Sequence, residues 1–162
     1  MSRDHSSRLV IKRVFNNSAV LAVDSSGAEQ VLLGRGIGFH LHSQDEVDQS
    51  RVDKVFVLTN PDTINRYSAL LSELSEAEID LSSEIVSRAR EALGDHVNAR
   101  VILPLSDHIS YAVRRAREGG SALDYELRWE VQHLYPKEVA FSREVIALIE
   151  QRLGVKVADS EV

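Results

Sequence analysis

Residues 32–39 have the residue types of a recognition loop. Within eight residues the segment holds three glycines, one guanidinium and one aromatic ring. Glycine lets the backbone approach a ligand closely, while Arg35 and Phe39 offer a planar cation and a ring for stacking. A dinucleotide-binding fingerprint is excluded, because the final G-x-x-G spacing is missing and no helical pattern follows. The alternative is a glycine-rich bend between two strands, with Phe39 in the core.

A second polar segment, Asn16-Asn17-Ser18, separates two short apolar runs. RNA is read mainly at loops and bulges, where flipped bases stack on aromatic or guanidinium groups and meet amide and backbone donors. The two segments together offer these chemistries through two amides, a guanidinium and a ring. The same residues also fit an ordinary turn followed by a buried phenylalanine. The residues alone leave both interpretations open.

His108 is the candidate for phosphoryl chemistry. If Ser106 caps a helix, His108 lies in its first turn, where unpaired backbone N–H groups and the positive dipole end favour a phosphoryl group. The same dipole favours the neutral imidazole, which is the nucleophilic form. A helical wheel places His108 at the edge of an apolar stripe, beside Arg115. We therefore predict that His108 is a phosphoacceptor; the alternative is a histidine of the capping region with no role.

The other polar residues predict no metal, cofactor or catalytic site. His40 and His42 would share one side of a strand, which is compatible with metal ligation, but no third ligand is apparent. The chain contains no cysteine nucleophile, and its spacing indicates no Ser/His/Asp set. We predict a protein that is not an enzyme and that uses neither a metal nor a cofactor.

The composition is that of an ordinary globular protein. The 162 residues are 43% hydrophobic and 27% charged, with a net charge of −6. The first 60 residues hold seven Lys or Arg and seven Asp or Glu, so the whole acidic excess follows them. Because the chain has no basic field, nucleic-acid binding would have to rest on a specific local site. The lack of cysteine, of a signal peptide and of a membrane-length apolar run predicts a cytoplasmic protein with no membrane insertion.

The first part of the chain is predicted to be a small antiparallel all-β domain. Short apolar runs separated by turn residues are typical of small sheets and barrels. A core of about fifty residues is thin, so self-association is expected. The predicted strands are residues 9–15, 19–23, 29–33, 37–41 and 52–58.

The apolar period becomes helical at Asn60-Pro61, where asparagine can cap a helix and proline suits its first position. The remainder is predicted to be an all-α helical bundle. Four further helices are predicted over about residues 82–93, 104–118, 122–135 and 136–153. In the third of these four, Leu123, Leu127, Val131 and Leu134 are predicted to face inward, and Trp129 is predicted to pack in the bundle with Tyr125 and Tyr135.

Six stretches, taken in order, resemble the bacterial antiterminator family of the BglG/LicT type. They are VFNNSAVLAV, LLGRGIGF, VDQSRVDKVFVL, LSSEIVSRA, LPLSDHISYAVRR and RWEVQHLYPKE. The resemblance implies an RNA-binding domain at 1–58 that acts as a homodimer, a short linker at 59–64, and a helical regulation domain at 65–162, truncated at its C-terminus.

The resemblance also implies the partners and the site residues. The partners are an RNA hairpin and, from the sugar phosphotransferase system, the phosphocarrier protein and the sugar permease that phosphorylate family members on histidine. The family's first regulatory histidine matches His108 in SDHISYAV. The implied RNA surface comprises Asn16, Asn17, Ser18, Gly34, Arg35, Gly36 and Phe39.

Two departures from the family pattern concern RNA contacts. The family turn usually reads Asn-x-Asn, whereas position 18 is serine, and His40, Leu41 and His42 stand where lysines are frequent. Both changes weaken phosphate contacts or indicate a different RNA sequence. The expected function is an antiterminator that binds a hairpin in nascent mRNA and prevents terminator formation. The alternative is a phosphorylation-responsive regulatory or scaffold module that does not bind RNA.

Overall fold

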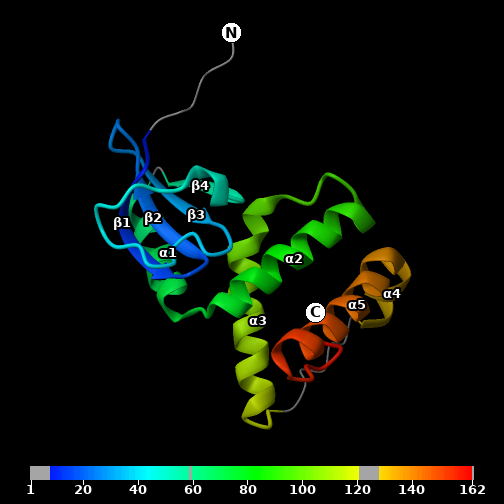
Figure 1. Cartoon of the computed structure of the whole chain (residues 1–162). Helices are drawn as coiled ribbons and strands as arrows, with labels where there is room; N and C mark the ends of the chain where they lie inside the picture. Colours follow the sequence, from blue (N-terminus) through cyan, green and yellow to red (C-terminus); the bar gives the residue numbers. More distant parts are fainter. Residues whose placement is uncertain (1–7, 59, 121–127, 162) are drawn as a thin grey trace. The chain divides into compact units, whose positions relative to one another are not determined.

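The structure is a computed structural model that describes residues 8–58, 60–120 and 128–161 (Figure 1). The chain forms two compact units, and the division between them falls between Glu76 and Ala77. The first unit contains an antiparallel sheet and the second contains helices. The predicted fold class is therefore confirmed.

The sheet has four antiparallel strands in the order β1-β2-β3-β4. They are β1 (Val10–Asn16), β2 (Ala19–Val23), β3 (Glu29–Leu33) and β4 (Lys54–Leu58). Alternate apolar residues of the strands face one side and build the core of this unit, as their period of two requires. The buried members of this core are Leu9, Ile11, Val20, Ala22, Leu32, Ile37 and Val47.

The strand predicted over residues 37–41 is wrong, because this segment is a run of tight turns. The backbone N–H groups of Ile37, Phe39 and Leu41 each donate to the carbonyl three residues earlier, at 3.1, 3.2 and 3.2 Å. Gly36 and His40 have φ angles of 72° and 57°, which turn the chain out of the extended conformation. Ile37 still reaches the core with 1% exposure, whereas Phe39 is 53% exposed.

The segment after these turns runs beside the free edge of β1. The N–H of Ile11 donates to Asp45 at 2.8 Å, and the N–H of Val47 donates to Leu9 at 2.9 Å. Val10 and Glu46 form an isolated antiparallel bridge. These bonds satisfy backbone groups that an edge strand would otherwise leave open, and they bring Val47 into the core.

Helix α1 (Pro61–Glu73) begins where the sequence predicts it. The side chain of Asn60 accepts a hydrogen bond from the N–H of Asp62 at 2.8 Å, and Pro61 occupies the first helical position. The helix contacts β1 and β4 (Figure 1). It therefore belongs to the unit of the sheet, and the division between the units lies twelve residues beyond the end of the predicted linker at 59–64.

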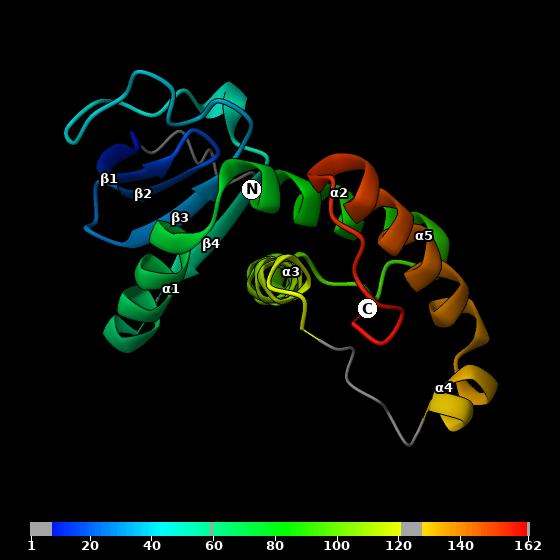
Figure 2. The same ribbon diagram turned by 90° about the horizontal axis from the view of Figure 1, so that it is seen from below.

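The helices of the second unit are α2 (Glu76–Leu93), whose first residue lies before the division, α3 (Ile102–Arg117), α4 (Arg128–Leu134) and α5 (Pro136–Leu153). Helices α2 and α5 lie side by side (Figure 2), and Arg152 of α5 pairs with Glu84 of α2 at 2.9 Å. Gly94 and Gly154 end α2 and α5 with φ angles of 111° and 66°, as their positions predict. The core combines α2, α3 and α5 through Leu81, Ile85, Ile109, Ala112, Val113, Val145, Ile146, Leu148 and Ile149.

Two helices begin earlier than predicted, because Ser82 and Ser106, which stand at or near the predicted helix starts, do not act as N-caps. Ser82 and Ser106 are buried within α2 and α3, and their hydroxyl groups donate to the carbonyls of Glu78 and Ile102, each at 2.8 Å. A buried serine inside a helix satisfies its hydroxyl in this way. The cap before α3 is Asn98, whose side chain accepts from the N–H of Arg100 at 2.9 Å and begins a short 3-10 turn.

The predicted inward face of the fourth predicted helix is wrong where the structure describes it. Val131 and Leu134 are 44% and 71% exposed, and Trp129 is 68% exposed instead of packed in the bundle. The Trp129 ring lies against the His133 ring, with centroids 4.1 Å apart. Tyr135 is 55% exposed. Leu123, Tyr125 and Leu127 lie outside the described residues. Within the described part of the chain, none of the helices has the length and apolar character needed to cross a membrane.

Candidate functional site

The Asn16-Asn17-Ser18 segment forms the turn between β1 and β2. The side-chain oxygen of Asn16 accepts a hydrogen bond from the N–H of Ser18 at 2.8 Å, so the turn is held from within. Asn17 is exposed at its tip. Ser18 is fully buried, and its hydroxyl has no hydrogen-bond partner among the described residues. Ser18 therefore lies beneath the surface that Asn17 presents.

The glycine loop packs directly on this turn. The N–H of Gly34 donates to Ser18 at 3.1 Å, and the N–H of Gly38 donates to Asn17 at 3.0 Å. The approach is closest at Gly38, where a Cβ would lie 2.3 Å from the carbonyl oxygen of Asn16. Only glycine fits such a distance without a shift of the backbone. The structure thus brings together the two segments that the sequence analysis singled out separately.

Arg51 is a supporting residue that the sequence analysis missed. Its Nη1 donates to the carbonyl of Gly36 at 3.0 Å, and its Nε lies 3.4 Å from a carboxylate oxygen of Asp48. A Cβ at Gly34 would lie 1.8 Å from the Arg51 carbonyl oxygen, so the backbone of Arg51 also borders the loop. The pKa of Asp48 is lowered, first by the Ser50 hydroxyl that donates to it at 2.6 Å. The signal available in the sequence was the capping pattern Asp48-x-Ser50 just before β4.

The predicted RNA-surface residues differ in burial. Arg35, Phe39 and Asn17 are exposed, Gly34 and Ser18 are buried, and Asn16 and Gly36 are partly buried. The Phe39 ring lies 4.0 Å from the His40 ring, measured between centroids. A guanidinium, an aromatic ring and an amide therefore reach solvent from one compact scaffold. The buried pair holds that scaffold in shape.

His40 and His42 do not share one side of a strand, because their segment is not a strand. His42 Nδ1 lies 3.8 Å from Asp45, and His40 packs on Phe39. Across the described residues, no group of three or more His, Asp or Glu side chains is arranged to hold a metal ion.

The end of helix α1 contacts the same turn. The side-chain amide of Asn16 donates to the carbonyl of Leu74 at 3.3 Å. Beside it, Arg13 of β1 donates to the Ser72 hydroxyl at 3.1 Å, and the Arg13 guanidinium lies 5.3 Å from the centre of the Phe15 ring. Both interactions lie within the first unit.

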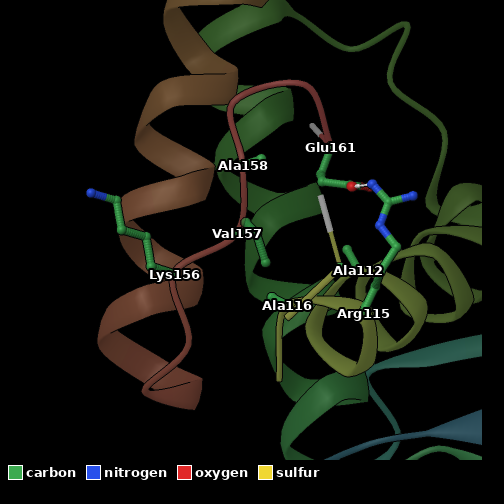
Figure 3. A pocket seen from close by; sticks show the side chains of 8 residues that line it. Ala112, Arg115, Ala116, Lys156, Val157, Ala158 and Glu161 are labelled. Carbon is green, nitrogen blue, oxygen red and sulfur yellow. Dashed lines mark ion pairs between the residues drawn. The ribbon is translucent and has the colours of Figure 1, made fainter. Parts of the chain in front are cut away.

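His108 is the seventh residue of α3, not a residue of its first turn. The prediction that Ser106 caps this helix is wrong, so the argument from unpaired N–H groups at the helix start no longer applies. His108 is exposed, and its Nε2 contacts the backbone carbonyl oxygen of Glu161. The carboxylate of Glu161 forms an ion pair with Arg115 (Figure 3). The helical wheel predicts that His108 lies beside Arg115, and the structure links both residues through Glu161.

Comparisons with known proteins find two domain families along the chain. Residues 9–65 match the CAT RNA binding domain family, and residues 83–162 match the PRD domain family. The chain is 35% identical over 153 residues to "Transcription antiterminator LicT" of Bacillus subtilis (strain 168), covering 93% of this chain and 54% of the relative. It is 32% identical over 151 residues to "Beta-glucoside operon antiterminator" of Dickeya chrysanthemi, covering 93% and 53%.

A solved structure resembles nearly the whole chain. The structure titled "Crystal structure of GlcT CAT-PRDI" superposes with a TM-score of 0.78 at 28% identity, covering 95% of this chain and 91% of that one. The chain spans about half the length of the curated relatives named above. The resemblance inferred from the sequence motifs is thereby confirmed. The chain belongs to the family of antiterminators in which a CAT RNA-binding domain is followed by a PRD domain.

Proposed function

We propose that this chain binds a partly paired hairpin in nascent mRNA and so prevents a terminator from forming in the same transcript. The observation that carries the proposal is the docking of the glycine loop on the Asn16–Ser18 turn. Through it, Asn17, Arg35 and Phe39 reach solvent from one rigid scaffold. An amide, a guanidinium and a ring are the groups that read unstacked bases. The antiterminator names of the relatives support the same reading.

The RNA-binding unit is proposed to act as a homodimer. Val55 and Val57 of β4 are 50% and 59% exposed, and among the described strands β4 pairs with β3 alone. An edge strand with exposed apolar side chains favours association. Two copies would double a binding surface that has no excess of basic charge.

Regulation is proposed to act through His108. The PRD match spans this residue, and the family resemblance gives the phosphocarrier protein and the sugar permease of the phosphotransferase system as phosphoryl donors. A phosphoryl group adds up to about two negative charges. At an exposed residue tied to the Glu161–Arg115 pair, that charge is enough to reorder the local contacts. An antiterminator that acts on nascent mRNA works in the cytoplasm.

The test is a titration of the whole chain with two short RNA hairpins, one carrying an internal loop and one fully paired. The proposal predicts saturable binding to the looped hairpin and at least tenfold weaker binding to the paired one, roughly the value of one or two lost base contacts. Equal affinity for both hairpins, or none for either, would favour a regulatory module that does not read RNA.

A further inference from the structure

Glu161 contacts two residues of α3 at once. Its backbone carbonyl oxygen meets Nε2 of His108. Its carboxylate pairs with the guanidinium of Arg115 (Figure 3). His108 and Arg115 are seven residues apart, so they lie on the same face of the helix, two turns from each other. Glu161 therefore contacts both the His108 imidazole and the Arg115 guanidinium.

The segment that carries Glu161 is fixed in place. The side chains of Glu161 and Arg115 are only 7% and 17% exposed. The N–H of Glu161 donates to the carbonyl of Ala158 at 3.0 Å, and Val157 is 2% exposed within the core of the helical unit. Arg115 and Glu161 border a hollow of about 290 Å³, and Lys156, which also borders it, points away from the ion pair (Figure 3). The position of the Glu161 carbonyl is thus set by the fold.

This contact determines which nitrogen of His108 can act as a nucleophile. A carbonyl oxygen only accepts hydrogen bonds, so the Nε2 that it meets must carry the proton. In the neutral ring the lone pair then belongs to Nδ1. Nδ1 has no partner among the described residues. We infer that Nδ1 is the phosphoacceptor atom of His108 and that Glu161 and Arg115 are positioning residues for it, an inference that rests on the proposed role of His108.

The transfer step follows from this arrangement. The Nδ1 lone pair forms a bond to the phosphorus atom of a phosphohistidine donor whose other ring nitrogen carries a proton. The donor's N–P bond breaks, its electron pair returns to the donor ring, and the donor leaves as a neutral imidazole. The proton on Nε2 stays where it is, shared with the Glu161 carbonyl oxygen. Acceptance at Nε2 would instead require the Glu161 segment to leave, because its carbonyl oxygen occupies the approach to that atom.

The first test determines which ring nitrogen of His108 carries the proton, and it needs no phosphorylation. Nitrogen-15 NMR of the whole chain at neutral pH is expected to show a slowly exchanging Nε2–H proton on His108. Arg115→Gln should lose that signal, because the Glu161 segment is released, and Arg115→Lys should partly restore it. Arg114→Gln is the matched control, since it removes the same charge from an exposed neighbour on α3. If circular dichroism shows that Arg115→Gln is unfolded, Glu161→Gln takes its place. A His108 Nε2 without a proton, or a signal unaffected by the folded variant, would overturn the inference.

The second test determines which ring nitrogen of His108 carries the phosphoryl group after phosphorylation. The chain is phosphorylated either by a reconstituted phosphocarrier system or by phosphoramidate, and phosphorus-31 NMR distinguishes the two phosphohistidine isomers. In the parent, the Nδ1 to Nε2 ratio at His108 should exceed that of exposed His42 about five- to tenfold, the effect of one hydrogen bond. That excess should vanish in the folded Arg115→Gln or Glu161→Gln variant. Predominant Nε2 product in the parent contradicts the inference. The expected ratio with phosphoramidate and no reaction with the carrier system would overturn the proposed regulation and leave the inference standing.

Discussion

The side-chain amide of Asn16 donates a hydrogen bond to the backbone carbonyl of Leu74 at 3.3 Å. Leu74 caps the end of α1, and the chain reaches the start of α2 two residues later. The side-chain oxygen of Asn16 accepts a hydrogen bond from the N–H of Ser18 and so stabilises the turn. The last turn of α1 is therefore tied to the turn on which the glycine loop docks, and helix and sheet form one unit.

The first prediction concerns where regulation can be uncoupled from RNA binding. A flexible Gly/Ser spacer inserted after Ser75 should leave RNA affinity unchanged, because α1 keeps its contacts with β1 and β4. The same insertion should abolish the effect of phosphorylation on RNA affinity. The measurement is RNA titration of the phosphorylated and unphosphorylated chain, with and without the spacer. Regulation that persists with the spacer would contradict a mechanical route.

A spacer placed between residues 59 and 60 is the informative comparison. It lengthens the connection between β4 and α1, so the chain no longer holds α1 close to β1. The Asn16–Leu74 and Arg13–Ser72 hydrogen bonds are then weakened. We expect the free energy of unfolding of the first unit to fall by about 0.5–1.5 kcal/mol, the usual value of a hydrogen bond. Urea unfolding measures it.

The second prediction tests the close approach of the loop and the turn. Gly38→Ala should destabilise the chain by about 1–3 kcal/mol, because the new Cβ would meet the carbonyl oxygen of Asn16 at 2.3 Å. RNA affinity should fall with it, since the loop is displaced from the turn. Gly119→Ala is the control: nothing lies within 4 Å of its added Cβ, so it carries only the cost of a positive φ. A Gly38→Ala variant with the stability and RNA affinity of the parent would show that the packing at Gly38 is unimportant.

Much of the fold follows from local sequence signals. The short apolar runs that form β1 to β3, the Asn60-Pro61 helix start and the glycines that end α2 and α5 each depend on residues close in sequence, and each is confirmed. Two features depend on distant contacts and were not predictable in that way. Ser82 and Ser106 look like caps but are buried inside helices, because the apolar residues before them also find core partners.

The candidate site was predicted in its parts but not in its assembly. The loop and the turn were each recognised from residue types, yet no periodicity shows that Gly38 and Asn17 are bonded. Arg51 was missed for the same reason, since it reaches Gly36 across fifteen residues. The apolar run at 37–41 resembles a strand, and positive φ angles at Gly36 and His40 prevent it from forming one.

The third prediction concerns acid sensitivity of the helical unit. Burial raises the pKa of Glu84, but hydrogen bonds from Arg88 and Arg152 outweigh it, so the folded pKa lies below the ordinary 4.5. A carboxyl group whose pKa is lower in the folded state stabilises the fold at pH values above its unfolded-state pKa. This stabilisation is lost as the pH falls through the folded-state pKa. Glu84→Gln should remove about 0.3–1 kcal/mol at pH 7 and much less near pH 3, because the pair is partly exposed.

Urea unfolding of the parent and the variant at the two pH values measures this effect, with Glu91→Gln, an exposed residue of the same helix, as the control. A loss that is as large near pH 3 as at pH 7 would mean that the ionised carboxylate of Glu84 is not the stabilising group.

The central claim is that the loop and the turn form an RNA-binding surface, and Arg35 tests it most directly. The measurement is the affinity of the whole chain for a hairpin RNA with an internal loop, compared among the parent, Arg35→Ala and Arg66→Ala. Arg66 is exposed on α1, so the two variants remove the same charge from the same unit. Arg35→Ala should weaken binding about 10- to 100-fold with an unchanged unfolding curve, and Arg66→Ala should bind like the parent. Parent-like affinity in Arg35→Ala, or equal losses in both variants, would contradict the assignment of this surface to RNA.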